Sequence, residues 1–111
     1  RGQIINITSI AGLTGRGSSL AYAASKAAAI SVTKSLAIAL APDVRVNSIA
    51  PGMVDSPWNT GREERVASAA AHTPMGRVAA PDDVAEIALD MAAGYSLVTG
   101  QTLLVDGGAN L

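Results

Sequence analysis

The sequence contains no cysteine, no phenylalanine and a single histidine. The lack of cysteine excludes disulfide bridges, thiol nucleophiles and thiolate metal sites, and His72 alone cannot build a zinc site, so we predict no metal. Aromatic residues make up 3% of the chain, and 8 basic and 9 acidic residues leave a formal net charge of -1. So few stacking side chains and no excess of positive charge argue against nucleic-acid binding.

Charged residues are scarce as well, at 15% of the 111 residues, against 49% hydrophobic residues. This composition excludes disorder and provides for one hydrophobic core, so we expect one domain or part of one. The longest stretch without a charge, 91–105, is shorter than the ~18–20 apolar residues of a membrane span and contains Gly, Ser, Thr and Gln. We therefore predict a soluble, cytoplasmic protein with no membrane partner.

The start of the chain resembles the interior of a longer sequence. Arg1 is followed directly by a β-branched run, with no initiator methionine and no signal-peptide pattern. We expect the chain to be the second half of a longer protein.

The first half of the chain predicts a strand, a helix and a second strand. Residues 3–8 and 44–49 are short β-branched runs, and residues 20–41 are rich in Ala, Leu and Ile. Ser18 or Ser19 is available as the N-cap of the helix and Pro42 as its stop. The order predicts a right-handed parallel βαβ unit. Because this helix is apolar nearly all round, we expect it to be covered on more than one side.

The second half predicts one more helix and one more strand. Pro81, with Asp82 and Asp83 after it, begins a helix that ends at Gly94, and residues 102–105 form the last strand. Residues 58–76 form a polar, Ala-rich loop with a short helix over 63–71, which is either a lid or an ordinary surface excursion. The fold class is α/β with a parallel sheet. The first strand lacks the charges that protect an edge, so we expect another strand beside it.

Three polar side chains gather where such sheets bind ligands, at the carboxyl ends of the strands. Ser9 follows the first strand, while Tyr22 and Lys26 lie four residues apart on one face of the helix that returns from that end. A free tyrosine hydroxyl has a pKa of ~10, so it needs a nearby cation to exchange protons at neutral pH. At ~4 Å and a dielectric constant of ~20, an ammonium attracts a phenolate by ~4 kcal/mol. We predict that Tyr22 transfers a proton with the help of Lys26 while Ser9 polarises a carbonyl oxygen.

Four motifs resemble the short-chain dehydrogenases/reductases, and most closely the 3-oxoacyl-carrier-protein reductase group. They span the chain in the family's order: Asn6-Ile7-Thr8-Ser9, Tyr22-Ala23-Ala24-Ser25-Lys26, Val46-Asn47-Ser48-Ile49-Ala50-Pro51-Gly52, and Thr99-Gly100-Gln101 with Val105-Asp106-Gly107-Gly108. The resemblance implies the carboxyl-terminal part of a Rossmann-like doubly wound sheet.

The resemblance also implies a reaction and its residues. Hydride would pass between NAD or NADP and a small-molecule carbonyl or alcohol, with Tyr22 as acid and base, Lys26 assisting it and contacting the nicotinamide ribose, and Ser9 holding the carbonyl. The turn after the second predicted strand would lie against the nicotinamide, through Pro51, Gly52, Val54 and Ser56. Asn47 and Asp106 match the family at positions that we interpret as structural. A homodimer or homotetramer is implied as well.

Family members are about twice as long, and this sequence has no counterpart of their amino-terminal half. No glycine-rich turn for a pyrophosphate occurs in it; Gly12, Gly15 and Gly17 occupy the loop after Ser9 and are not interpreted as a phosphate site. We therefore expect the isolated chain to be inactive and to bind nicotinamide cofactor weakly or not at all.

Two other functions are compatible with the sequence. The apolar helix and the unprotected first strand suit an interaction or oligomerisation module, or one half of a split enzyme. An epimerase or dehydratase of the family's extended branch is a weaker alternative, because the sequence has no substrate domain after its last strand.

Overall fold

A computed structural model describes the chain from Arg1 to Leu111. The order of its elements is β1 (Gly2–Ile7), α1 (Ala11–Thr14), α2 (Leu20–Leu40), β2 (Val44–Pro51), η1 (Pro57–Asn59), α3 (Glu63–His72), α4 (Pro81–Ala93) and β3 (Thr102–Val105). The three strands and the three longer helices lie where the sequence predicts them. The α/β class is confirmed, whereas the short helices α1 and η1 were not expected.

The strands form one parallel sheet in the order β1-β2-β3. The central strand β2 supplies the core, with Val46, Ile49 and Ala50 fully buried. Because β2 pairs on both sides and is covered on both faces, all of residues 46–51 are buried. The polar Asn47 and Ser48 among them form side-chain hydrogen bonds. In this chain β1 is an edge strand, and its Ile7 is 49% exposed.

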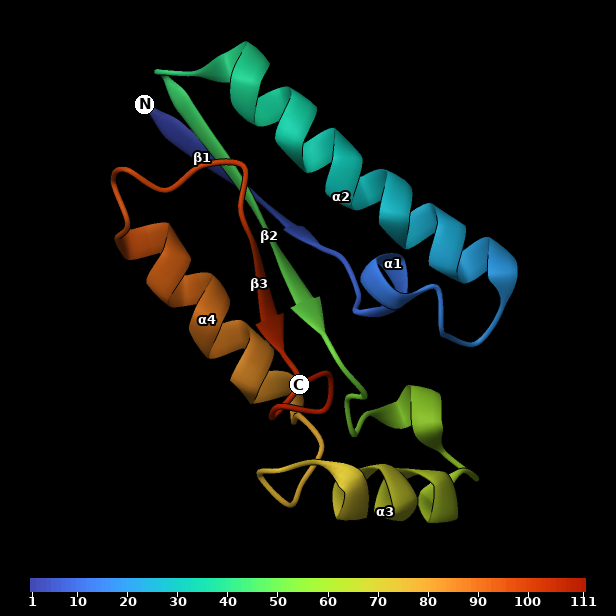
Figure 1. The fold of residues 1–111 in the computed structure, drawn as a ribbon. Coiled ribbons are helices and arrows are strands. Elements are labelled where there is room, and N and C mark those ends of the chain that lie inside the picture. The colour runs from blue at the N-terminus through green and yellow to red at the C-terminus, as the bar shows by residue number, and fades with distance from the viewer.

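The two longest helices, α2 and α4, flank the sheet on opposite faces (Figure 1). From β1 to β2 and from β2 to β3, the chain moves across the sheet in the same direction. Since the connecting helices lie on opposite faces, the two connections have opposite hands. The β1-α2-β2 unit is right-handed as predicted, and the connection through α3 and α4 is the uncommon left-handed one.

Helix α2 begins and ends as the sequence predicts. The Ser19 hydroxyl caps it by accepting a hydrogen bond of 3.1 Å from the Tyr22 amide, and the helix ends two residues before Pro42. Only its face toward the sheet is buried, while Leu20 and Ile38 on the other side are 87% and 84% exposed. The expectation that this helix is covered on more than one side is therefore wrong within this chain.

By length and composition, α2 is also long and apolar enough to cross a membrane. It contains Lys26 and Lys34, so it does not stand out among stretches that are free of charge. The core helix of a soluble protein passes the same test, so the property is weak evidence.

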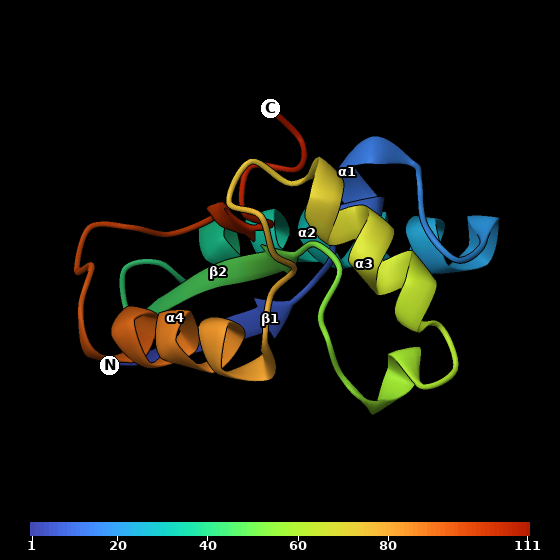
Figure 2. The same ribbon diagram turned by 90° about the horizontal axis from the view of Figure 1, so that it is seen from below.

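Residues 55–78, called the excursion below, leave the sheet after β2 and return before α4. An isolated bridge between Val54 and Ala79 closes its base, with hydrogen bonds from the Asp55 amide to Ala79 O (2.8 Å) and from the Ala79 amide to Met53 O (3.1 Å). Seen from below, its helix α3 lies across the end of the sheet, near α1 in that projection (Figure 2). The excursion therefore covers the carboxyl ends of the strands.

Candidate functional site

Ser9 lies directly beyond β1 and is held there by the backbone. The amides on either side of it donate to β2, from Thr8 to Ile49 O at 2.7 Å and from Ile10 to Pro51 O at 3.1 Å. The side chain is 92% buried, and its oxygen accepts the Ala11 amide at 3.1 Å. Because a hydroxyl is both donor and acceptor, the Ser9 proton remains available for a ligand.

Tyr22 and Lys26 project from the first two turns of α2, as their spacing predicts. The Lys26 Nζ lies 5.8 Å from the centroid of the Tyr22 ring, in a cation-π arrangement. It also donates a hydrogen bond of 3.1 Å to Ile7 O at the end of β1. The Lys26 ammonium thus lies over the Tyr22 ring, where its positive charge favours the phenolate form of the side chain. The same ammonium joins α2 to the strand that carries Ser9.

Gly12 lets α1 approach α2 beside these residues. A Cβ at this position would lie 2.6 Å from the Ala27 nitrogen and 2.6 Å from the Lys26 carbonyl carbon. Only glycine therefore permits this contact, which sets the position of Lys26 relative to the Ser9 loop.

A cleft of about 610 Å³ opens at the carboxyl ends of the strands. It brings together five of the seven residues predicted for the site: Ser9, Tyr22, Gly52, Val54 and Ser56. Lys26 and Pro51 do not line it. Pro51 is buried at the end of β2, where its carbonyl accepts the Ile10 amide, and its contact with a cofactor stays a prediction.

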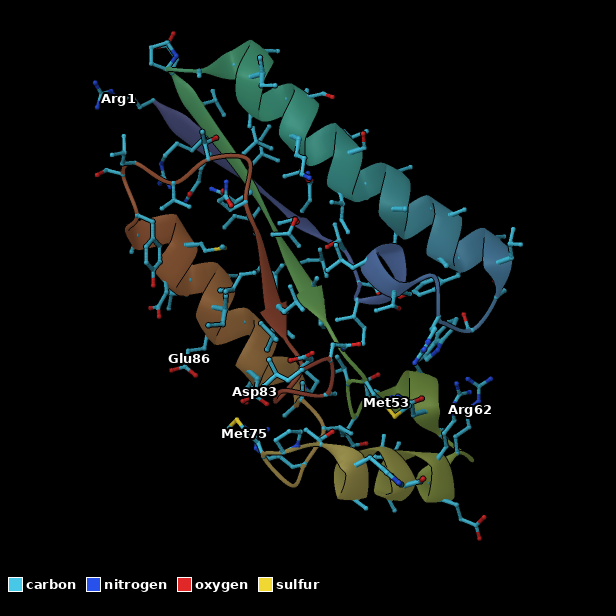
Figure 3. The ribbon with its side chains drawn as sticks, viewed as in Figure 1. Arg1, Met53, Arg62, Met75, Asp83 and Glu86 are labelled. Carbon is cyan, nitrogen blue, oxygen red and sulfur yellow. The ribbon has the colours of Figure 1, made fainter.

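The opposite wall of the cleft is basic and was not predicted. Arg62, directly before α3, lines the cleft on this side together with Arg65 and His72. Arg16 lines the cleft from the loop between α1 and α2. Figure 3 shows the Arg62 side chain rising from α3 toward that loop. The spacing of residues 62, 65, 69 and 72 could have predicted this wall, because residues three and four apart share one face of a helix. All four line the cleft.

Two positions interpreted as structural have that role. The buried Asn47 side chain donates to Val98 O at 2.9 Å and accepts the Gln101 amide at 3.0 Å. Asp106 accepts the amides of Gly108 and Asn110 and the Asn110 side chain at 2.9–3.2 Å. Burial opposes the ionisation of Asp106, but these hydrogen bonds outweigh it and hold the pKa of the carboxyl below its usual value.

A family model described as Enoyl-(Acyl carrier protein) reductase matches residues 1–110. The short-chain dehydrogenase/reductase homolog YusR of Bacillus subtilis is 47% identical over 110 residues, which cover 99% of this chain and 84% of that protein. The 3-oxoacyl-[acyl-carrier-protein] reductase FabG of Thermotoga maritima is 39% identical, over 96% of this chain and 45% of that protein.

Solved structures give the same result. A crystal structure of the 3-oxoacyl-[acyl-carrier protein] reductase of Brucella melitensis superposes with a TM-score of 0.87 at 42% identity. The match covers 97% of this chain and 42% of that one. The chain therefore spans less than half the length of several relatives that it matches.

Proposed function

The chain belongs to the short-chain dehydrogenase/reductase family, and from this membership we propose that it is the carboxyl-terminal, catalytic half of one Rossmann-like domain in an NAD(P)-dependent oxidoreductase. The reaction transfers hydride between nicotinamide and a carbonyl or secondary alcohol, as in reduction of a 3-oxoacyl group. The observation that carries the proposal is that Ser9 and Tyr22 line one cleft at the carboxyl ends of parallel strands.

The residues of the cleft fit the nicotinamide end of the cofactor. Gly52 lines it without a side chain, and a Cβ there would lie 3.0 Å from the Asp106 Cβ. Glycine at this position therefore allows the turn to pack closely against Asp106. In the proposed complex, Val54 and the Ser56 hydroxyl are available to the carboxamide and Tyr22 to the ribose. Lys26 would assist from beside the Tyr22 ring. When bound, NAD or NADP supplies or accepts the hydride. Residues outside this chain would hold its pyrophosphate.

The chain's own groups manage the proton. In reduction, the Tyr22 hydroxyl gives its proton to the carbonyl oxygen, while the Ser9 hydroxyl donates a hydrogen bond to the same oxygen. The positive charge of Lys26 above the ring stabilises the phenolate that remains. In oxidation the same proton returns to Tyr22.

The test uses the protein extended upstream of Arg1 as its gene encodes it, followed by nicotinamide absorbance. Because proton transfer by a positioned side chain contributes ~10²–10⁴-fold, Tyr22→Phe should lower kcat by at least ~100-fold. The matched control is Tyr95→Phe, which changes the only other tyrosine, 56% exposed and outside the cleft. Equal activity of the two variants would refute the assignment.

The isolated chain provides a second measurement. Cofactor contacts to adenosine and pyrophosphate would be missing, so a preparation with an intact mass of 11.1 kDa should not turn over NADH or NADPH. Turnover by that preparation would show that these residues alone suffice.

The exposed side of α2 supports assembly as a homodimer or homotetramer in the cytoplasm, because Leu20 and Ile38 are left in water. The same observation favours the second candidate function, an interaction module or one half of a split enzyme. Light scattering distinguishes association from a folded monomer of 11.1 kDa, and the Tyr22→Phe comparison distinguishes an enzyme from a module.

A further inference from the structure

We propose that the substrate carries an anionic group, a carboxylate or a phosphate ester, apart from its carbonyl, and that Arg16, Arg62 and Arg65 bind that group. The assignment of the carbonyl end rests on the proposed function. The assignment of the anionic end rests on the basic wall of the cleft alone.

The three arginines reach the cleft from both of its sides. Arg62 and Arg65 come from the first turn of α3 and Arg16 from the loop before α2. None of their guanidinium groups makes a hydrogen bond or an ion pair, since the one ion pair of the chain joins Arg77 to Asp83. Guanidinium groups match the geometry of carboxylates and phosphates, which they bind through two parallel hydrogen bonds.

Acidic side chains do not neutralise this wall. Asp106 is the only acidic residue that lines the cleft, and its carboxylate already accepts three hydrogen bonds. Glu63 and Glu64 follow Arg62 directly but do not line the cleft. Glu63 instead accepts the Gly61 amide at 3.0 Å. Helix α3 therefore turns its cationic face inward and its acidic residues away.

Apolar side chains line the cleft together with these polar groups. Met53, Val54 and the 73% exposed Trp58 belong to this lining. A ligand with a carbonyl at Ser9 and Tyr22, a short apolar body and an anionic end would satisfy every part of the lining. A neutral ketone would leave the three guanidinium groups without a partner.

A dinucleotide phosphate is the other possible source of the anion, and the experiment includes an arm for it. The isotope-labelled 111-residue chain is titrated with levulinate, a short oxo acid, and with its uncharged methyl ester, while amide chemical shifts are recorded. Parallel titrations use inorganic phosphate and NADP⁺. Because binding is the readout, the result does not depend on whether the isolated chain catalyses a reaction.

Levulinate should bind at least ~10-fold more tightly than its ester, a difference of ~1.4 kcal/mol, and should shift the amide signals of residues 16, 62 and 65. Arg62→Gln combined with Arg65→Gln should abolish this preference, because both side chains are exposed and their loss should leave the fold intact. Arg1→Gln combined with Lys34→Gln is the control, since it removes the same two positive charges from exposed positions outside the cleft.

Two results would overturn the inference. One is equal or undetectable binding of acid and ester, or a preference that survives in the double variant. The other is a double variant that loses inorganic phosphate but keeps levulinate, which would assign the arginines to a phosphate of the cofactor. Either result would leave the proposed function intact if the extended protein still reduces a neutral ketone and Tyr22→Phe does not.

Discussion

The two walls of the cleft are built in different ways. On one side, the Ser9 loop continues the pairing of β1 with β2, and Gly12 allows α1 to approach the α2 backbone. On the other side, the excursion is held at its base by the Val54–Ala79 bridge, and Arg62 and Arg65 are exposed. The groups assigned to the chemistry thus belong to packed elements, whereas two of the three arginines assigned to substrate recognition belong to a surface segment.

This difference has a physical reason. A proton transfer requires its groups to be held within a fraction of an ångström, which buried backbone hydrogen bonds can ensure. Recognition of an exposed charge tolerates more movement, because a guanidinium can bind a carboxylate in several orientations. Substitutions in one wall should therefore leave the other wall largely unchanged.

Replacing Ile49 by Ala should cause the largest loss of stability. Ile49 is fully buried at the centre of β2, and truncation of such a residue costs ~2–5 kcal/mol. Val66→Ala, a truncation at a half-buried position of α3, should cost less than half as much. Denaturant unfolding followed by circular dichroism measures both values. Similar losses would mean that the excursion is as firmly packed as the sheet.

Gly12→Ala should destabilise the wall that carries Ser9 and Tyr22 by ~1–3 kcal/mol, because the added Cβ has no space against the α2 backbone. Gly2→Ala is the matched control, since nothing lies within 4 Å of a Cβ there. The emission of Trp58, the only tryptophan, reports on the excursion. If the emission is unchanged below the unfolding transition, the structural change caused by Gly12→Ala does not extend to the excursion.

Substitution of two asparagines allows the polar contacts of the sheet and of the excursion to be compared. Asn47→Ala leaves Val98 O and the Gln101 amide without their partner near the buried strand β2, at a cost of ~1–3 kcal/mol. Asn59→Ala removes one bond of 2.6 Å to Val54 O in the excursion and should cost ~1 kcal/mol. Thermal unfolding should rank Asn47→Ala well below Asn59→Ala in stability, and the reverse order would contradict the comparison.

The smallest effect concerns the ion pair between Arg77 of the excursion and Asp83 of α4, with N–O distances of 2.6 and 2.8 Å. The hydrogen bond from Arg77, with that from the Ala80 amide, holds the pKa of Asp83 well below its ordinary value of 3.8. A carboxyl with a lowered folded-state pKa stabilises the protein above its ordinary pKa, and this contribution is lost as the pH falls through the lowered value.

Asp83→Asn should therefore lower the unfolding temperature slightly at neutral pH, and the difference from the unmodified chain should shrink as the pH falls below about 4. The variant retains an oxygen for the Ala80 amide, so it isolates the ion pair. A difference that stays constant with pH would show that the charge of Asp83 contributes nothing.

Elements with strong local signals could be predicted from the sequence. Ser19 and Pro42 define the limits of α2, Pro81 begins α4, and β-branched runs mark the strands. Helix α1 could not be predicted, because it has only four residues, two of them the weak helix formers Gly12 and Thr14, and no side-chain cap. It forms because its backbone packs against α2, which no local pattern records.

Only part of the candidate site could be predicted, because tertiary packing decides which side chains face the cleft. Ser9 and Tyr22 follow from the rule that parallel strands end at one edge of the sheet, and they line one cleft. Their catalytic roles remain predictions. The contact of Lys26 with Ile7 O and the burial of Pro51 depend on how α2 and the Ser9 loop pack, so the sequence could not decide which residues face the cleft.

By itself, the sequence determined the three strands, the three longer helices, the α/β class and the order of the motifs, because propensities, caps and hydrophobic periodicity act over a few neighbouring residues. Only the tertiary structure decided that α2 keeps one face exposed, that the connection through α4 is left-handed and that three arginines share a cleft with Ser9. These properties depend on residues far apart in the chain, whose proximity is set by packing rather than by local preference.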